Sequence, residues 1–240
     1  MTVEINRELA VKVLGVVDAG LVKGMGNPTP GQMCVEAAVN YAMGAPHGDQ
    51  PACVANSLRR LKIRLNDAAW SSDAARTAGL RRLAIAQLGS AGALDEKEFS
   101  KRVATLAIQT SVPAALRAAA GVLKGSHKDQ LLKMADLCER EPTRSNALTA
   151  RNEARAAADA AAADAYAAYA AYAAYAAANA AADAAADAAY ADAAAAAARD
   201  KSLAAFCEAV VQILIDMKAP GCEWIDLTET VTPFFARPST

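Results

Sequence analysis

Residues 154–198 read ARAAADAAAADAYAAYAAYAAYAAANAAADAAADAAYADAAAAAA, an alanine stretch with single tyrosine, aspartate and asparagine residues at regular intervals. Alanine is the strongest helix former, because it loses no side-chain entropy and buries no polar group. Neither glycine nor proline occurs between residues 151 and 219. The stretch therefore predicts a long α-helix that the rest of the chain has to accommodate.

A continuous helix of this length does not fit inside a compact domain. At 1.5 Å per residue it spans roughly 68 Å, whereas a compact globule of this chain length is about 45 Å across. The helix is therefore expected to protrude, to run along a partner, or to break into a hairpin. The expected break points are Asn179 and residues 199–202.

Four tyrosines recur at every third position within the stretch: Tyr166, Tyr169, Tyr172 and Tyr175. Steps of three residues make them a slanted ridge on a helix, with bare alanine faces beside it that let another helix approach closely. We interpret the segment as a packing helix. The alternatives are an aromatic ladder for a ligand or partner, and a low-complexity expansion without a dedicated role.

Apolar residues at helical spacing occur on both sides of the alanine stretch. The clearest amphipathic stripe follows Ser202 and comprises Leu203, Phe206, Cys207, Val210, Val211, Leu214 and Met217. No segment shows the alternation of a β-strand. We therefore predict an all-α fold, a multi-helix bundle with one long Ala-rich helix that is either continuous or broken into a hairpin.

The composition suggests three segments. Residues 1–141 form an N-terminal helical domain, and residues 142–200 form the Ala/Tyr-rich helix. Residues 201–240 form an amphipathic helix and an irregular tail that pack back on the N-terminal domain. Residues 1–150 hold 19 Lys and Arg against 14 Asp and Glu, and residues 151–240 hold 6 against 12. Neither balance indicates the strongly basic surface that nucleic-acid binding requires.

Five cysteines are present, at wide and irregular spacing: Cys34, Cys53, Cys138, Cys207 and Cys222. The N-terminus carries no signal-peptide pattern, and the alanine stretch is too weakly hydrophobic to span a membrane. We expect a cytoplasmic protein with free thiols and no membrane partner.

Several helix starts can be placed from turn and capping residues. Thr29 is expected to cap a helix that ends near residue 43, with Pro30 at the first helical position. Asp49 or Gln50 is expected to begin the next helix. Further along, Asp95 is expected to cap a helix, because Glu98 three residues later fits a capping box.

Loops rich in glycine and proline lead into helix N-termini within residues 23–73. The free N–H groups of such N-termini suit phosphates and carboxylates, and Lys23 would add positive charge. Loops of this kind are also common as plain connectors. The candidate ligand-binding residues are Lys23, Asn27, His47, Asp49 and Trp70.

The same region contains the candidate catalytic residues His47, Asp49 and Asp67. His47 would be a general base, with Asp49 or Asp67 orienting its ring. In the structural alternative, Asp49 caps a helix and His47 donates a hydrogen bond within its loop. Trp70 either lines a pocket or fills the edge of a core.

No cofactor or metal site is predicted. The chain has no Walker loop, dinucleotide fingerprint, nucleophile elbow or HExxH motif. It has two histidines, which argues against a His-rich metal centre, and the spacing of Cys34, His47 and Cys53 matches no standard zinc finger. The basic cluster Arg59, Arg60, Lys62 and Arg64 is interpreted as a solvated helix face.

The chain outside the alanine stretch resembles a family of alanine-rich proteins of bacteria and phages. The resemblance is carried by GNPTPGQMCVEAAVNYAMGAPHGDQPACV (residues 26–54), RLNDAAWSSDAARTAGLRRLAIAQLGS (residues 64–90) and VVQILIDMKAPGCEWIDL (residues 210–227). That family has no established activity, so the resemblance implies an origin but no role. The Ala-rich helices alone are similar to immunity proteins of bacterial toxin systems.

These observations favour binding over catalysis. We expect a non-enzymatic helical binding or scaffold protein of bacterial or phage origin, which forms a homo-oligomer through the Ala/Tyr helix. One alternative is a small-ligand or phosphate-binding protein, including a hydrolase, that uses the loops of residues 23–73 for an anionic ligand. The other is an immunity-type protein that occludes a partner toxin.

Overall fold

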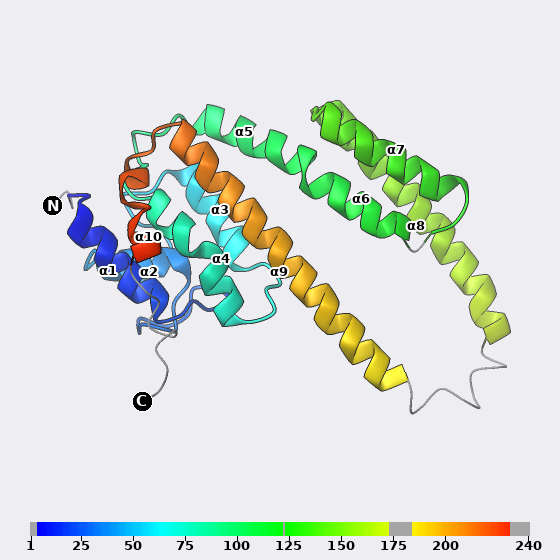
Figure 1. The fold of residues 1–240 in the computed structure, drawn as a ribbon, viewed down its shortest axis with the longest axis horizontal. Helices are drawn as coiled ribbons and strands as arrows, with labels where there is room; N and C mark the ends of the chain where they lie inside the picture. Colours follow the sequence, from blue (N-terminus) through cyan, green and yellow to red (C-terminus); the bar gives the residue numbers. More distant parts are fainter. Residues whose placement is uncertain (1–3, 122, 173–183, 231–240) are drawn as a thin grey trace. The chain divides into compact units, whose positions relative to one another are not determined.

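The computed structural model describes residues 4–121, 123–172 and 184–230, with the backbone alone described for the helical residues 161–172 and 184–195. In this part of the chain the secondary structure is helical, without a β-strand, so the all-α prediction is confirmed (Figure 1). None of the described helices is both long enough and apolar enough to cross a membrane.

The chain divides into two compact units. Unit 1 comprises Met1–Arg102 and Ala194–Thr240, and unit 2 comprises Val103–Ala193. Whether the segments 1–141, 142–200 and 201–240 fold as separate domains stays a prediction.

Unit 1 is built around α4, which packs against α1, α2, α3 and the 3₁₀ helix η1. Fully buried leucines from four helices and from the turn after α4 form its core: Leu14, Leu58, Leu80, Leu83, Leu88 and Leu214. The helices of the unit are α1 (Arg7–Asp18), α2 (Val35–Ala42), α3 (Asn56–Asn66), α4 (Asp73–Ala86), η1 (Pro220–Trp224) and α10 (Leu227–Thr230). The first part of α5 (Glu96–Gln109) and the last part of α9 (Ala184–Asp216) complete it.

The start of α2 differs from its prediction. The helix begins at Val35 with Cys34 as its N-cap, not after Thr29. The preceding loop is instead held by backbone hydrogen bonds to the chain that follows α1, from Val22 to the Met33 carbonyl at 3.0 Å and from Asn27 to the Gln32 carbonyl at 2.7 Å. These tertiary contacts outweigh the local capping pattern.

The start of α3 was also predicted wrongly. The helix begins at Asn56, with Ala55 at the N-cap position, instead of at Asp49 or Gln50. The prediction for α5 is confirmed, because the Asp95 carboxylate accepts hydrogen bonds from the backbone of Lys97 at 3.1 Å and of Glu98 at 3.0 Å.

The loop between α3 and α4 is attached to α9. The Asp200 carboxylate accepts a hydrogen bond from the Ser71 backbone at 2.8 Å, and Arg199 donates to the Ala69 carbonyl at 2.7 Å. Because α9 continues through residues 199–202, the break predicted there is wrong. The alternative break at Asn179 lies outside the described residues, as does the choice between a continuous helix and a hairpin.

Unit 2 contains α6 (Ser111–Gly121), α7 (Ser126–Arg140) and α8 (Arg144–Tyr172), which pack on one another. Its described core is small: Leu116, Ala120, Leu131, Met134, Ala135, Cys138, Ala150 and Ala157. The contribution of α8 to this core is alanine alone, as expected of a close-packing helix. The tyrosine ridge falls among side chains that the structure does not describe.

Candidate functional site

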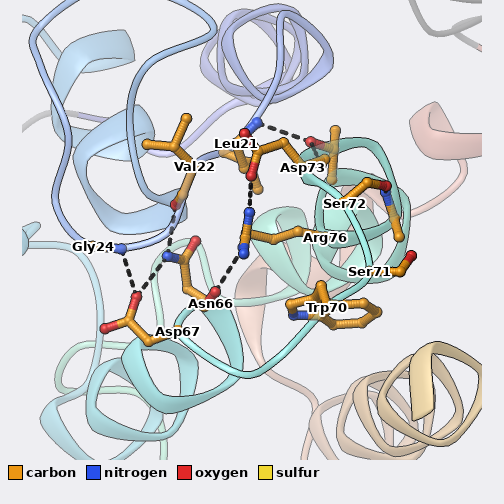
Figure 2. Close-up of polar contacts among 12 residues, drawn as sticks. Leu21, Val22, Gly24, Asn66, Asp67, Trp70, Ser71, Ser72, Asp73 and Arg76 are labelled. Atoms are coloured by element: carbon orange, nitrogen blue, oxygen red, sulfur yellow. Dashed lines mark hydrogen bonds and ion pairs between the residues drawn. The ribbon is translucent and has the colours of Figure 1, made fainter. Parts of the chain in front are cut away.

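The end of α3 ties together the loop after α1 and the start of α2, and Figure 2 shows its bonds to the loop. Asn66 is buried, and its amide nitrogen donates to the Val22 carbonyl at 2.9 Å. Its amide oxygen accepts from the Val35 backbone at 3.2 Å. The Asp67 carboxylate accepts from the Gly24 backbone at 2.8 Å and from Asn66 at 3.0 Å. Two adjacent polar residues therefore fix both segments.

A pocket with a volume of about 50 Å³ lies between these segments. Three acidic residues line it: Glu36 from α2, Asp49 from the loop before α3, and Asp67 from the end of α3. The rest of the lining is Asn66, Gly24 and the apolar residues Met25, Cys34, Val35 and Ile63. The pocket is therefore small, and its acidic residues lie in a lining that is otherwise largely apolar.

Glu36 and Lys62 form an ion pair beside this pocket, and both side chains are completely buried. Glu36 Oε1 lies 3.6 Å from Lys62 Nζ. Neither carboxylate oxygen nor the ammonium has a hydrogen-bond partner among the described residues. Buried charges normally carry such partners, because an unsatisfied charged group costs more than the attraction of one ion pair returns.

The buried position of Glu36 changes its acidity. Burial raises the pKa of Glu36 to about 7, although the positive charge of Lys62 acts in the opposite direction. Burial likewise lowers the pKa of Lys62, against the effect of Glu36. The raised pKa means that the Glu36 carboxyl exchanges a proton near neutral pH.

Sequence reasoning missed this pair. Lys62 was grouped with Arg59, Arg60 and Arg64 as a solvated face, and for Lys62 that interpretation is wrong. A signal was available, since Lys62 follows Leu58 by four positions and precedes Leu65 by three, which places it on the core-facing stripe of α3. Glu36 likewise interrupts an otherwise apolar run from residue 33 to residue 39.

Two of the sequence-predicted residues, Asp49 and Asp67, line the same pocket. The Asp49 carboxylate lies 3.6 Å from the Arg59 guanidinium, which also donates to the Asp49 carbonyl at 3.4 Å. Lys23 and Asn27 are exposed and do not line the pocket. Asn27 donates instead to the Gln32 side chain at 3.4 Å.

His47 is placed as a loop residue. Its Nε2 lies 3.1 Å from the Gly26 carbonyl oxygen, and because a carbonyl only accepts, this nitrogen is the donor. No hydrogen bond among the described residues joins His47 to Asp49 or Asp67. The structure therefore brings the two aspartates together, but not as partners of the histidine ring.

Trp70 belongs to the core of unit 1 and not to the pocket. The side chain is buried, and its Nε1 donates to the Leu65 carbonyl at 2.8 Å. Its ring packs so closely on α4 that a Cβ at Gly79 would lie 2.2 Å from Cη2. The tryptophan thus fixes the turn between α3 and α4.

The cysteines near the site have structural surroundings. Cys34 caps α2, with its Sγ accepting from the Ala37 backbone at 3.4 Å. Burial raises the pKa of both the Cys34 and the Cys53 thiol, which keeps them protonated and unreactive. In the described part of the chain, no three His, Cys, Asp or Glu side chains are arranged to hold a metal ion.

A second pocket, of about 320 Å³, lies between the end of α1 and α4. Small residues form most of its wall: Ala19, Gly20, Gly31, Ala74 and Ala78. A buried ion pair between Asp18 and Arg81 also lines it. None of the ligand-binding or catalytic candidates from the sequence lies there.

Comparisons with protein-family models, with curated proteins and with solved structures found no match for this chain. The site is therefore interpreted from its own geometry and chemistry.

Proposed function

We propose that this chain is a non-enzymatic binding protein and that the pocket between α2 and the end of α3 is its ligand site. The observation that carries the proposal is Glu36. Glu36 is one of the residues that line the pocket, its carboxylate is fully buried, and neither oxygen has a hydrogen-bond partner among the described residues. A ligand that supplies donors would compensate this cost.

The arrangement of the candidate catalytic residues also supports binding. General acid–base catalysis requires the base to be within hydrogen-bond reach of the group it serves. His47 instead donates a hydrogen bond to the Gly26 carbonyl, while the Asp67 carboxylate accepts one from the Gly24 backbone. Both side chains are used to shape the loop that forms one wall of the pocket.

A fragment screen followed by NMR tests the proposal. The full chain, labelled with ¹⁵N, is titrated with small cationic, neutral and anionic fragments. We expect at least one class to shift the backbone amides of Gly24, Glu36 and Asp67. The proposal is wrong if no class shifts these amides.

A matched pair of variants locates the binding. Asp49→Asn with Asp67→Asn changes two carboxylates of the pocket and should weaken the binding. Asp136→Asn with Glu139→Gln changes two exposed carboxylates that pair with Arg117 in unit 2, and should leave it unchanged. Equal loss in both variants would contradict a site at α2 and α3.

Self-association through the Ala/Tyr helix, a toxin partner and a cytoplasmic location stay predictions. All five cysteines lie in described regions and are free thiols, which agrees with a reducing compartment. Sedimentation velocity of the full chain tests self-association, since an oligomer should become a monomer when the four ridge tyrosines are replaced by alanine.

A further inference from the structure

We infer that the pocket between the end of α1 and α4 binds an uncharged, apolar small molecule of about the size of one or two fused rings. All the residues that line this pocket belong to unit 1. It shares no lining residue with the pocket between α2 and α3. The inference therefore concerns a second site and does not depend on the first.

The volume of the pocket suits a small organic molecule. Pockets that bind such molecules measure roughly 300–1,000 Å³, and an apolar cavity of about 150 Å³ is enough to hold one benzene molecule. The pocket between α1 and α4 has a volume of about 320 Å³. It therefore has room for one or two fused rings.

Short side chains open the pocket. Ala74 and Ala78 lie four residues apart on one face of α4, and both are exposed. Ala19 and Gly20 after α1 and Gly31 of the following loop supply the other small residues of the lining. The surface that the pocket offers is mostly apolar, so a ligand gains free energy by burying its own apolar surface there.

The buried polar groups of the lining already have partners within the protein. Arg81 donates to both carboxylate oxygens of Asp18. The Thr77 hydroxyl donates to the Asp73 carbonyl at 2.8 Å and accepts from the Leu21 backbone at 2.8 Å. A polar ligand would lose its hydrogen bonds to water here and would find few partners in return.

The charges of the lining are also balanced. The Asp18 carboxylate and the Arg81 guanidinium neutralise each other. Asp73, whose side chain is largely exposed, pairs with Arg76. No net charge is left to attract an ion of either sign, so the lining favours an uncharged molecule.

The same contacts hold the walls of the pocket in place. The Thr77 hydroxyl joins α4 to Leu21, and the Asp18–Arg81 pair joins α4 to α1. Gly31 has a φ of 86°, and a Cβ there would lie 2.9 Å from the Ala19 carbonyl oxygen. The pocket is thus formed before a ligand arrives, which lowers the ordering cost of binding.

Three probes built on one ring test the inference on the full chain labelled with ¹⁵N: toluene, benzylamine and benzoate. At pH 7 benzylamine is a cation and benzoate is an anion. We expect toluene to shift the backbone amides of Gly20, Thr77 and Ala78, with at least tenfold higher affinity than either charged probe. If a charged probe binds there as tightly as toluene, or if no probe shifts these amides, the inference is wrong.

A matched pair of variants locates the binding. Ala78→Leu fills the pocket from α4 and should lower the affinity for toluene at least tenfold, while the exposed position keeps the thermal unfolding midpoint near that of the wild type. Ala205→Leu makes the same change at an exposed position of α9 outside the lining, and should leave the affinity unchanged. If Ala78→Leu does not fold, Ala74→Leu takes its place. An unchanged affinity in the folded pocket variant would overturn the inference.

A second copy of the chain is the competing occupant, and sedimentation velocity distinguishes it from a small molecule. An oligomer that Ala78→Leu or saturating toluene converts to a monomer would show that a partner surface fills the pocket, and the inference would be wrong. An oligomeric state that neither changes supports a small-molecule site. Shifts at Gly24, Glu36 and Asp67 report the other pocket, so the two proposals succeed or fail separately.

Discussion

The Asp18–Arg81 pair and the Glu36–Lys62 pair are both buried in unit 1, yet they satisfy their charges differently. Arg81 donates to the two carboxylate oxygens of Asp18 at 2.6 and 2.9 Å, and a further N–H donates to the Thr228 carbonyl. Glu36 and Lys62 face each other at 3.6 Å, without a hydrogen bond within the described structure.

The chemistry of the two cations explains this contrast. A guanidinium is a planar fork that matches both oxygens of a carboxylate, whereas an ammonium is a point charge that does not fix the carboxylate in one orientation. The Asp18–Arg81 pair therefore ties α1 to α4 and α10, with its donors directed at fixed acceptors. The Glu36 carboxylate therefore keeps unused acceptor capacity, and Glu36 is one of the residues that line the small pocket.

The largest expected effect comes from breaking the satisfied pair. Arg81→Met leaves the Asp18 carboxylate buried without its partner, and should lower the free energy of unfolding by about 4 kcal/mol in urea titrations at pH 7. Arg82→Met is the matched control, because Arg82 is partly exposed and pairs with Glu208 and Glu229 at 3.3 and 3.4 Å. It should cost less than about 1 kcal/mol. Equal losses would contradict the structural role of Arg81.

Removing the other pair as a unit should cost far less than breaking it. Glu36→Leu alone leaves Lys62 buried without a partner, and should destabilise the fold by about 3 kcal/mol at pH 8. Glu36→Leu combined with Lys62→Met should bring the free energy of unfolding back to within about 1 kcal/mol of the wild type, or above it. A double variant as unstable as the sum of the single variants would show that the two residues are not coupled.

The pH dependence of stability separates the pairs further. The pKa of Glu36 is raised in the folded state, from 4.5 to about 7. Its contribution to stability is therefore complete below pH 4.5 and is lost as the pH rises through 7. Relative to Glu36→Gln, the wild type should lose about 2 kcal/mol of unfolding free energy between pH 5 and pH 8, measured in urea.

The lowered pKa of Lys62 acts in the opposite sense. Its contribution is present above the unfolded pKa of 10.5 and is lost as the pH falls through the folded value. Because Glu36→Gln keeps Lys62, its comparison with the wild type between pH 5 and pH 8 reports the change at Glu36. A wild type that keeps or gains stability relative to Glu36→Gln over this range would contradict the raised pKa.

The smallest effect is expected at His47. His47→Ala removes one hydrogen bond to the Gly26 carbonyl, and should cost about 1 kcal/mol in thermal or urea unfolding. Its effect on the affinity of any fragment that binds the pocket between α2 and α3 should stay below twofold, because His47 is not among the residues that line it. A tenfold loss of affinity at unchanged stability would show that His47 belongs to the binding site.

Local signals in the sequence predicted where the helices lie better than they predicted the residue at which each helix begins. Asp95 was identified as an N-cap because its partners are two and three residues away. Thr29 was misread because Asn27 and Met33 bind backbone partners across the loop instead of starting a helix. Capping patterns report local preference, and tertiary hydrogen bonds outweighed them here.

The candidate site was predictable only in part. The loops of residues 23–73 drew attention to Asp49 and Asp67, and both line the pocket. Their glycines suggested an anion, whereas the pocket is lined by three acidic residues, and the third of these is Glu36 inside an apolar run. The position of Lys62 on the apolar stripe of α3 was readable from its spacing to Leu58 and Leu65, and would have indicated a buried charge.

The sequence by itself determined the helical class, because alanine propensity and 3.6-residue periodicity act over a few neighbouring positions. The sequence also indicated that polar side chains of the candidate site lie in the loops of residues 23–73. Only the packing of the helices brings Glu36 of α2 to Lys62 of α3 and places Asp49 and Asp67 at the same pocket as Glu36. That pairing depends on how two helices pack, and the free energy of packing comes from contacts between residues far apart in the chain.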